Sequence, residues 1–149
     1  MKNNTALFAL IPFVITFNLI ACTPAPFTRH KSPNIHGIIL SNHIPANGIE
    51  LYLSIDGDDK YCSKFIAKTV TDDKGDFSIS SIKEKMDYTP LMTYYLDEWN
   101  LCATVAGTRQ LIYSNNRYDK GGAIASVNLE CDLKKIGKQA PCNVPLLKD

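Results

Sequence analysis

The region from residue 35 to residue 131 alternates between short β-type runs and turn signals. Segment 49–55 is the clearest run, because four aliphatic residues recur at every second position from Ile49 to Ile55. This is the period of a half-buried strand. Turn signals rich in Gly, Asn and Asp recur every ~8–12 residues, a spacing typical of antiparallel sandwiches and barrels. The pattern predicts an all-β protein.

About eight short strands are expected in this region. They cover 35–40, 49–55, 64–71, 77–79, 93–96, 101–106, 109–113 and 124–131. Gly75 is expected to adopt a positive φ in the turn before 77–79, and Gly107-Thr108 is expected to form a tight hairpin. A single helical turn is predicted at Ile82–Met86, limited by the proline that follows it.

Length and charge restrict the class of protein further. The chain has 149 residues, of which 45% are apolar and 21% charged. These values fit one globular domain rather than a disordered tail, a collagen-like fibre or a coiled coil. A formal net charge of +1 provides no extended basic field for nucleic acid.

The N-terminal 21 residues have the character of an export signal. Lys2 precedes an apolar run from Ala6 to Ala21, which is short for a membrane-spanning helix. The run ends in Leu19-Ile20-Ala21-Cys22, which resembles the lipobox of bacterial lipoproteins. The resemblance implies cleavage between Ala21 and Cys22 and acylation of Cys22, which would anchor the chain in a lipid bilayer. A non-lipidated signal peptide and an uncleaved anchor are the alternatives.

The sequence after Cys22 predicts a tether and a location. Residues 22–34 contain three prolines and no apolar period, so they are expected to form a short stiff linker. In enterobacterial-type lipoproteins an Asp after the lipidated Cys favours the inner membrane. Thr23 stands at this position, so the resemblance implies the outer membrane, with the domain facing the periplasm.

Four cysteines remain after Cys22. An exported chain is expected to form two disulfides with them, because they are even in number and widely spaced. They are Cys62, Cys102, Cys131 and Cys142. The spacing lacks the close pairs of a zinc site. Three connectivities are open. In the expected strand 101–106, the side chain of Cys102 points to the face opposite that of Leu101 and Ala103. A direct Cys102–Cys131 pair would therefore need a bulge or a register shift.

Residues 35–79 resemble the transthyretin-like sandwiches of the carboxypeptidase regulatory-domain type. Those domains combine a strand containing Gly, a Pro-x-x-Gly turn, an amphipathic strand and a Thr-Asp-x-x-Gly-x-Phe hairpin. The matching residues are Gly37, Pro45, Gly48, Thr71, Asp72, Gly75 and Phe77. The resemblance implies an antiparallel transthyretin-like (prealbumin-like) sandwich of about seven to eight strands over residues 35–133. Residues 134–149 contain Gly137, Pro141 and Pro145 and are expected to form a C-terminal coil.

Residues 107–133 also look like part of an uncharacterised family of bacterial lipoproteins with this kind of domain. The matching stretches are Tyr113, Asn116-Arg117-Tyr118-Asp119 and Val127–Leu133. No activity comes with this resemblance. It implies only a fold and a location. A function does not follow, because a fold alone does not define one.

Catalytic and metal-binding patterns are weak. His30, His36 and His43 lack a third ligand nearby and are expected to be solvated or turn residues, so no metal or cofactor is expected. The acidic runs 56–59 and 72–76 do not match a calcium loop and are expected to shape turns through Asx hydrogen bonds. Core packing is expected for most of a set of aromatic residues, and an exposed group that binds a protein partner is the alternative. These residues are Tyr94, Tyr95, Trp99, Tyr113 and Tyr118.

The polar loop 115–122 is the candidate binding segment, with Arg117, Tyr118 and Asp119 at its centre. We expect a non-enzymatic envelope lipoprotein whose sandwich binds a protein or glycan partner. A periplasmic immunity or inhibitor lipoprotein that neutralises a secreted toxin is the second hypothesis. An enzyme with a site assembled from distant loops is the third, and no motif supports it.

Overall fold

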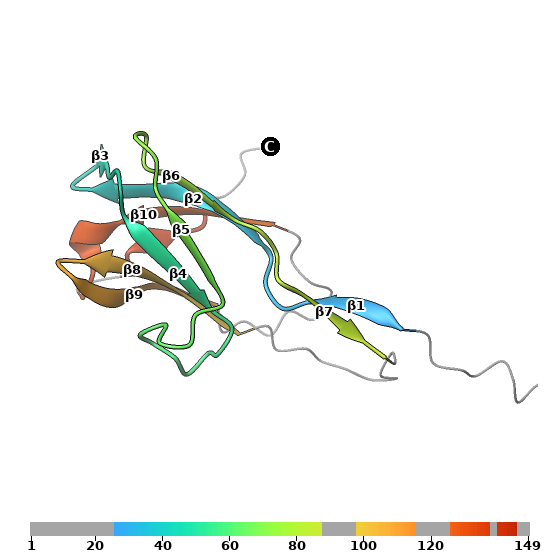
Figure 1. Cartoon of the computed structure of the whole chain (residues 1–149). Coiled ribbons are helices and arrows are strands. Elements are labelled where there is room, and N and C mark those ends of the chain that lie inside the picture. Colours follow the sequence, from blue (N-terminus) through green and yellow to red (C-terminus); the bar gives the residue numbers. More distant parts are fainter. Residues whose placement is uncertain (1–25, 88–97, 116–125, 138–139, 146–149) are drawn as a thin grey trace, which may run out of the picture.

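The computed structural model describes residues 26–87, 98–115, 126–137 and 140–145, and these form an all-β protein of two packed sheets with a projecting ribbon (Figure 1). The strands are β1 (Phe27–His30), β2 (Asn34–Ser41), β3 (Ile44–Pro45), β4 (Glu50–Ser54), β5 (Ala67–Val70), β6 (Asp76–Ile79), β7 (Lys83–Met86), β8 (Trp99–Val105), β9 (Thr108–Asn115), β10 (Ser126–Asp132) and β11 (Cys142–Asn143). A 3₁₀ helix, η2, covers Leu133–Lys135. The expected all-β sandwich is confirmed.

One sheet is built around β2. β2 pairs in parallel with β10 and antiparallel with β6 and β3, and β11 extends the sheet beyond β10. The second sheet has the strand order β5-β4-β8-β9 and is antiparallel throughout. The turn between β5 and β6, which contains Gly75 at φ +77°, connects the two sheets. The predicted positive φ of Gly75 is therefore confirmed.

The core lies between the sheets and follows the alternation of the strands. Ile35 and Ile39 of β2 face Leu51 and Leu53 of β4, and all four are fully buried. Trp99 is 1% exposed and stacks near Tyr113, with the ring centroids 5.1 Å apart. Trp99 is therefore part of the core, as expected, and the partly buried Tyr113 packs against it. Tyr94, Tyr95 and Tyr118 lie outside the described residues.

Gly37 is the point of closest approach in the β2 sheet. A Cβ at this position would overlap the carbonyl oxygen of Leu129 and would lie 2.9 Å from Cε1 of Phe77. The space that a side chain would need is therefore already filled by the neighbouring strand and the Phe77 ring. Larger residues here would overpack the core and force the strands apart.

The segment 82–86 differs from its prediction. The expected helical turn is wrong, because Lys83–Met86 form strand β7. β7 pairs with Phe27–His30, which lie within the expected tether and form β1. The local sequence favours a helical turn. Backbone hydrogen bonds to β1, which is distant in sequence, stabilise the extended conformation instead. Part of the segment expected to be a linker is therefore ordered.

Other boundaries shift by a few residues. β5 begins at Ala67, so residues 64–66 belong to the preceding loop. The turn between β8 and β9 uses Ala106 and Gly107, both at positive φ, rather than Gly107-Thr108. The tail expected as coil contains η2 and β11. The expected strand 93–96 lies outside the described residues.

Two disulfides are present, as expected, and their pairing is now defined. Cys62 bonds to Cys102 and Cys131 to Cys142. Cys102 lies on the outer face of its sheet with Cys62, whereas Cys131 and Cys142 belong to the core. The alternation of strand β8 thus separates Cys102 from Cys131, in agreement with the face argument from the sequence.

The two disulfides are expected to contribute unequally to stability. Their sequence separations are 40 and 11 residues, and the chain-entropy model gives about 4 and about 3 kcal/mol for loops of these sizes. Urea unfolding of the oxidised protein should show that the variant Cys62→Ala/Cys102→Ala loses about 1 kcal/mol more than Cys131→Ala/Cys142→Ala. An equal or reversed order would show that loop closure does not determine the difference.

Candidate functional site

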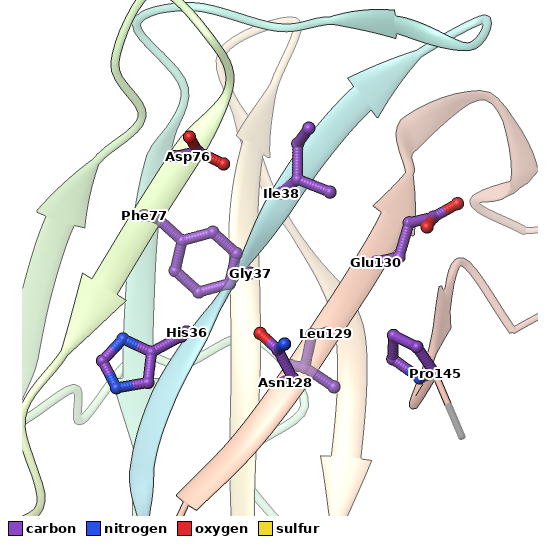
Figure 2. Close-up of a pocket in the computed structure, with 9 residues that line it drawn as sticks. All are labelled: His36, Gly37, Ile38, Asp76, Phe77, Asn128, Leu129, Glu130 and Pro145. Atoms are coloured by element: carbon purple, nitrogen blue, oxygen red, sulfur yellow. The ribbon is translucent and has the colours of Figure 1, made fainter. Parts of the chain in front are cut away.

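A groove crosses the outer face of the β2 sheet over β6, β2 and β10 (Figure 2). Its volume is about 480 Å³, and Pro145 from the C-terminal tail borders it beyond β10. The lining residues are His36, Gly37, Ile38, Asp76, Phe77, Asn128, Leu129, Glu130 and Pro145. The groove is therefore built from three paired strands and from the tail that follows β11.

The polar side chains of the groove come from positions that alternate with core residues. His36, Asp76, Asn128 and Glu130 are exposed, while their neighbours along each strand are buried, apart from the half-buried Gly37. Within the described ranges none of these four side chains has a hydrogen-bond or ion-pair partner in the protein. Two carboxylates, an imidazole and an amide are thus held on a rigid sheet and are available to bind a ligand.

The outer face of the other sheet has a different character, because its polar groups are paired with each other. The Arg109 guanidinium lies 3.9 Å from the centroid of the Tyr52 ring and donates to the carbonyl oxygen of Cys62 at 3.0 Å. The Tyr52 hydroxyl donates to Glu50 at 2.6 Å. A hydrogen bond from Lys68 is the largest cause that lowers the pKa of Glu50, followed by the one from Tyr52. These contacts stabilise the fold and leave few groups for a ligand.

Loop 55–66 covers one end of this face and is organised by two side chains. Asn100 is fully buried, and its Nδ2 donates to the carbonyl oxygens of Asp56, Gly57 and Asp59 at 2.9–3.2 Å. Asp59 accepts hydrogen bonds from the backbone amides of Ser63 and Lys64 at 2.9 and 2.8 Å. The acidic residues of this loop therefore serve its geometry.

The same holds for the second acidic run. Asp72 Oδ1 accepts from the backbone amides of Lys74 and Asp76, each at 2.9 Å. Asp56 likewise accepts from the amide of Asp58 at 3.1 Å. The expected Asx hydrogen bonds are confirmed in both runs. In the described part of the chain, no group of three or more His, Cys, Asp or Glu residues could hold a metal ion.

A polar corner joins β10 to the turn after β2. Asp132 accepts from the backbone amides of Lys134 and Asn42 at 3.0 and 3.1 Å. The amide of Lys134 is the main cause that lowers the pKa of Asp132. Asn42 and His43 both have positive φ, as in type I′ turns. His43 is exposed, as expected for a turn histidine.

Most of the residues predicted to be functional are not brought together by the described structure. Ala21, Cys22 and the loop residues Arg117, Tyr118 and Asp119 lie outside the described residues. His36 is exposed, as expected for a solvated histidine, but it lines the groove, which the sequence analysis missed. The available signal was the alternation of polar and apolar residues in 34–36 and 126–131.

Comparisons with known proteins do not provide an identity. No protein-family model, curated protein or solved structure matches the chain. None of the described segments forms a helix with the length and apolarity needed to span a bilayer. The functional argument therefore rests on the residues of this chain.

The Asp59 carboxylate makes the free energy of unfolding depend on pH in the acid range. Desolvation raises the pKa of Asp59, but hydrogen bonds from Lys64, Ser63 and Ser54 outweigh it and lower the pKa from 3.8 to about 2. A lowered folded-state pKa contributes stability that is present above pH 3.8 and is lost as the pH falls towards 2.

The variant Asp59→Asn cannot titrate at this position. Urea unfolding between pH 6 and pH 2 should show a lower free energy of unfolding for Asp59→Asn at pH 6, and the deficit should shrink at acid pH. The exposed Asp73→Asn is the matched control and should follow the wild-type profile. A deficit that stays constant with pH would contradict the role assigned to Asp59.

Proposed function

We propose that this protein is a lipid-anchored envelope lipoprotein whose sandwich acts as a non-enzymatic binding module. The anchor is supported by the apolar leader and by Leu19-Ile20-Ala21-Cys22, with Cys22 as the acylated residue. Two or three acyl chains on one cysteine give stable anchoring. Thr23 supports the outer membrane as the location, with the domain in the periplasm.

A transthyretin-like sandwich is part of this proposal. It is supported by how the residues of the resemblance meet in space. The Thr71 hydroxyl donates to the carbonyl oxygen of Ala46 at 2.6 Å and accepts from the amide of Ile49 at 2.9 Å, which closes the Pro-x-x-Gly turn. A Cβ at Gly75 would lie 2.5 Å from the carbonyl oxygen of Ile39. Both residues therefore have structural roles, as expected for a fold signature.

The binding role rests on one observation, the unpaired polar side chains in the groove across β6, β2 and β10. His36, Asp76, Asn128 and Glu130 offer donors and acceptors without protein partners in the described part, and Ile38 and Pro145 add apolar area. Such a mixed surface on a rigid scaffold suits a protein loop or a glycan. The solvent exposure of these four side chains favours binding over catalysis, because electrostatic catalysis depends on sites that exclude water.

Substitution of Cys22 tests the anchor. Cys22→Ser removes the thiol that would carry the lipid, so incorporation of radiolabelled palmitate should be lost and the protein should leave the membrane fraction. The neighbouring substitution Thr23→Ser should retain both. A Cys22→Ser protein that still incorporates palmitate would overturn the assignment of Cys22 as the lipidated residue, and one that stays in washed membranes would indicate another anchor or an uncleaved signal.

Site-specific photo-crosslinking tests the groove. A benzophenone amino acid at Asn128 should give a crosslinked species in intact envelopes, because this position lies in the groove. The same group at Lys74, in the turn between β5 and β6, should not. The charge reversal Glu130→Lys should weaken the Asn128 crosslink, and the exposed Asp58→Lys should not. Equal crosslinking at both positions would exclude the groove as the binding face.

A further inference from the structure

The ribbon formed by β1 and β7 projects from one end of the sandwich (Figure 1). Its base is fixed by hydrogen bonds. The amide of Lys31 donates to the carbonyl oxygen of Ile82 at 2.7 Å, and the buried Ser32 hydroxyl accepts from the amide of Ile82 at 3.1 Å. Ser81 donates to the carbonyl oxygen of Ser32 at 2.7 Å. The ribbon therefore has a defined direction relative to the sandwich.

The two faces of the ribbon differ in charge. Thr28 lies opposite Lys85 and His30 opposite Lys83, so these four residues share one face. Lys83 and Lys85 are exposed, and no ion pair within the described residues includes either of them. We call Thr28, His30, Lys83 and Lys85 the basic face.

The acidic side chain of the ribbon lies on the opposite face. Glu84 is paired with Lys31 at 3.0 Å, and Arg29 lies opposite Glu84 in the register. Asp87 follows the end of β7, two residues after Lys85. Taken together, residues 27–31 and 83–87 carry four Lys or Arg and two Asp or Glu. The chain from Cys22 to Asp149 contains 15 of each, so the excess at the ribbon is local.

The ribbon is also the described part of the fold that is closest in sequence to the proposed anchor. Phe27 stands five positions after Cys22 in the sequence. An extended chain rises by at most ~3.6 Å per residue, so the start of β1 lies within about 18 Å of the Cα of Cys22. Membrane anchoring would thus hold the basic face at high effective concentration beside lipid headgroups.

We propose that the basic face of the β1–β7 ribbon lies against the anionic phosphates of the membrane that holds Cys22. This inference rests on the proposed lipid anchor. Lys83 and Lys85 contact the phosphates, and each lysine near an anionic surface favours the bound arrangement by a factor of about five. Because the base of the ribbon is fixed, this contact sets the orientation of the sandwich on the bilayer.

The test uses the mature lipidated protein in vesicles. One vesicle type contains 30% phosphatidylglycerol and 70% phosphatidylcholine, and the other contains phosphatidylcholine alone. Acetylation of lysines by a water-soluble reagent is followed by peptide mass spectrometry. Lys83 and Lys85 should react at least about fivefold more slowly on the anionic vesicles at low salt, and 0.5 M salt should remove most of this protection.

Lys74 is the internal control, because it is exposed in the turn between β5 and β6, away from the ribbon (Figure 1). Its rate should be the same on both vesicles. Equal rates for Lys83 and Lys85 on both vesicles would overturn the inference. Acyl modification of Cys22 is measured by mass in the same sample. An unacylated Cys22 would refute the anchor, whereas an acylated protein with unprotected lysines would refute the membrane contact alone.

A pair of variants separates charge from simple closeness to the membrane. His30 shares the basic face, so its modification by diethylpyrocarbonate reports contact without involving the substituted lysines. On anionic vesicles, Lys83→Gln/Lys85→Gln should restore the reaction of His30, and the matched control Lys60→Gln/Lys74→Gln should leave it protected. His43, whose side chain is 81% exposed in the turn after β2, is the reference histidine. Continued protection in the ribbon variant would show that the lysines do not hold the face on lipid.

Discussion

The pairing of β2 is the constraint on which the sandwich depends. β2 hydrogen-bonds to β3, β6 and β10, and its Ile35 and Ile39 are fully buried against the second sheet. Gly37 allows the Leu129 carbonyl and the Phe77 ring to approach more closely than a side chain would permit. The inner side of this strand forms the core, and its outer side supplies the middle of the groove. Core packing and the candidate binding surface are therefore set by the same backbone.

The two sheets treat their outward polar groups differently. On the β4 sheet, Glu50, Tyr52 and Arg109 bind one another or the backbone, and Asn100 and Asp59 fix the loop that lies above them. A buried or half-buried polar group needs such partners, because an unpaired one costs about 1–3 kcal/mol. On the β2 sheet the polar groups are solvated, so they need no partner in the protein. This difference marks the β2 sheet as the face with capacity for a ligand.

Sequence reasoning succeeded where one local signal was enough. The strand of alternating residues at 49–55, the turn glycine Gly75 and the Asx role of Asp72 followed from spacing and backbone chemistry. It failed at 82–86, because strand β7 exists through pairing with β1, about 55 residues earlier. The groove was also missed, since it joins residues from three strands and the tail. Only the register between those strands brings His36 beside Asn128 and Ser78.

The short disulfide has a consequence beyond stability. Cys131 of β10 holds Cys142 of β11, and Pro145, three residues later, borders the groove. The pairing of β11 with β10 and the hydrogen bond from the amide of Asp132 to the carbonyl oxygen of Pro141 at 2.8 Å also hold the tail here. Oxidation of this cysteine pair thus completes the outline of the groove. In a reducing environment this bond would be absent, so the position of Pro145 at the border of the groove would depend on the redox conditions around the chain.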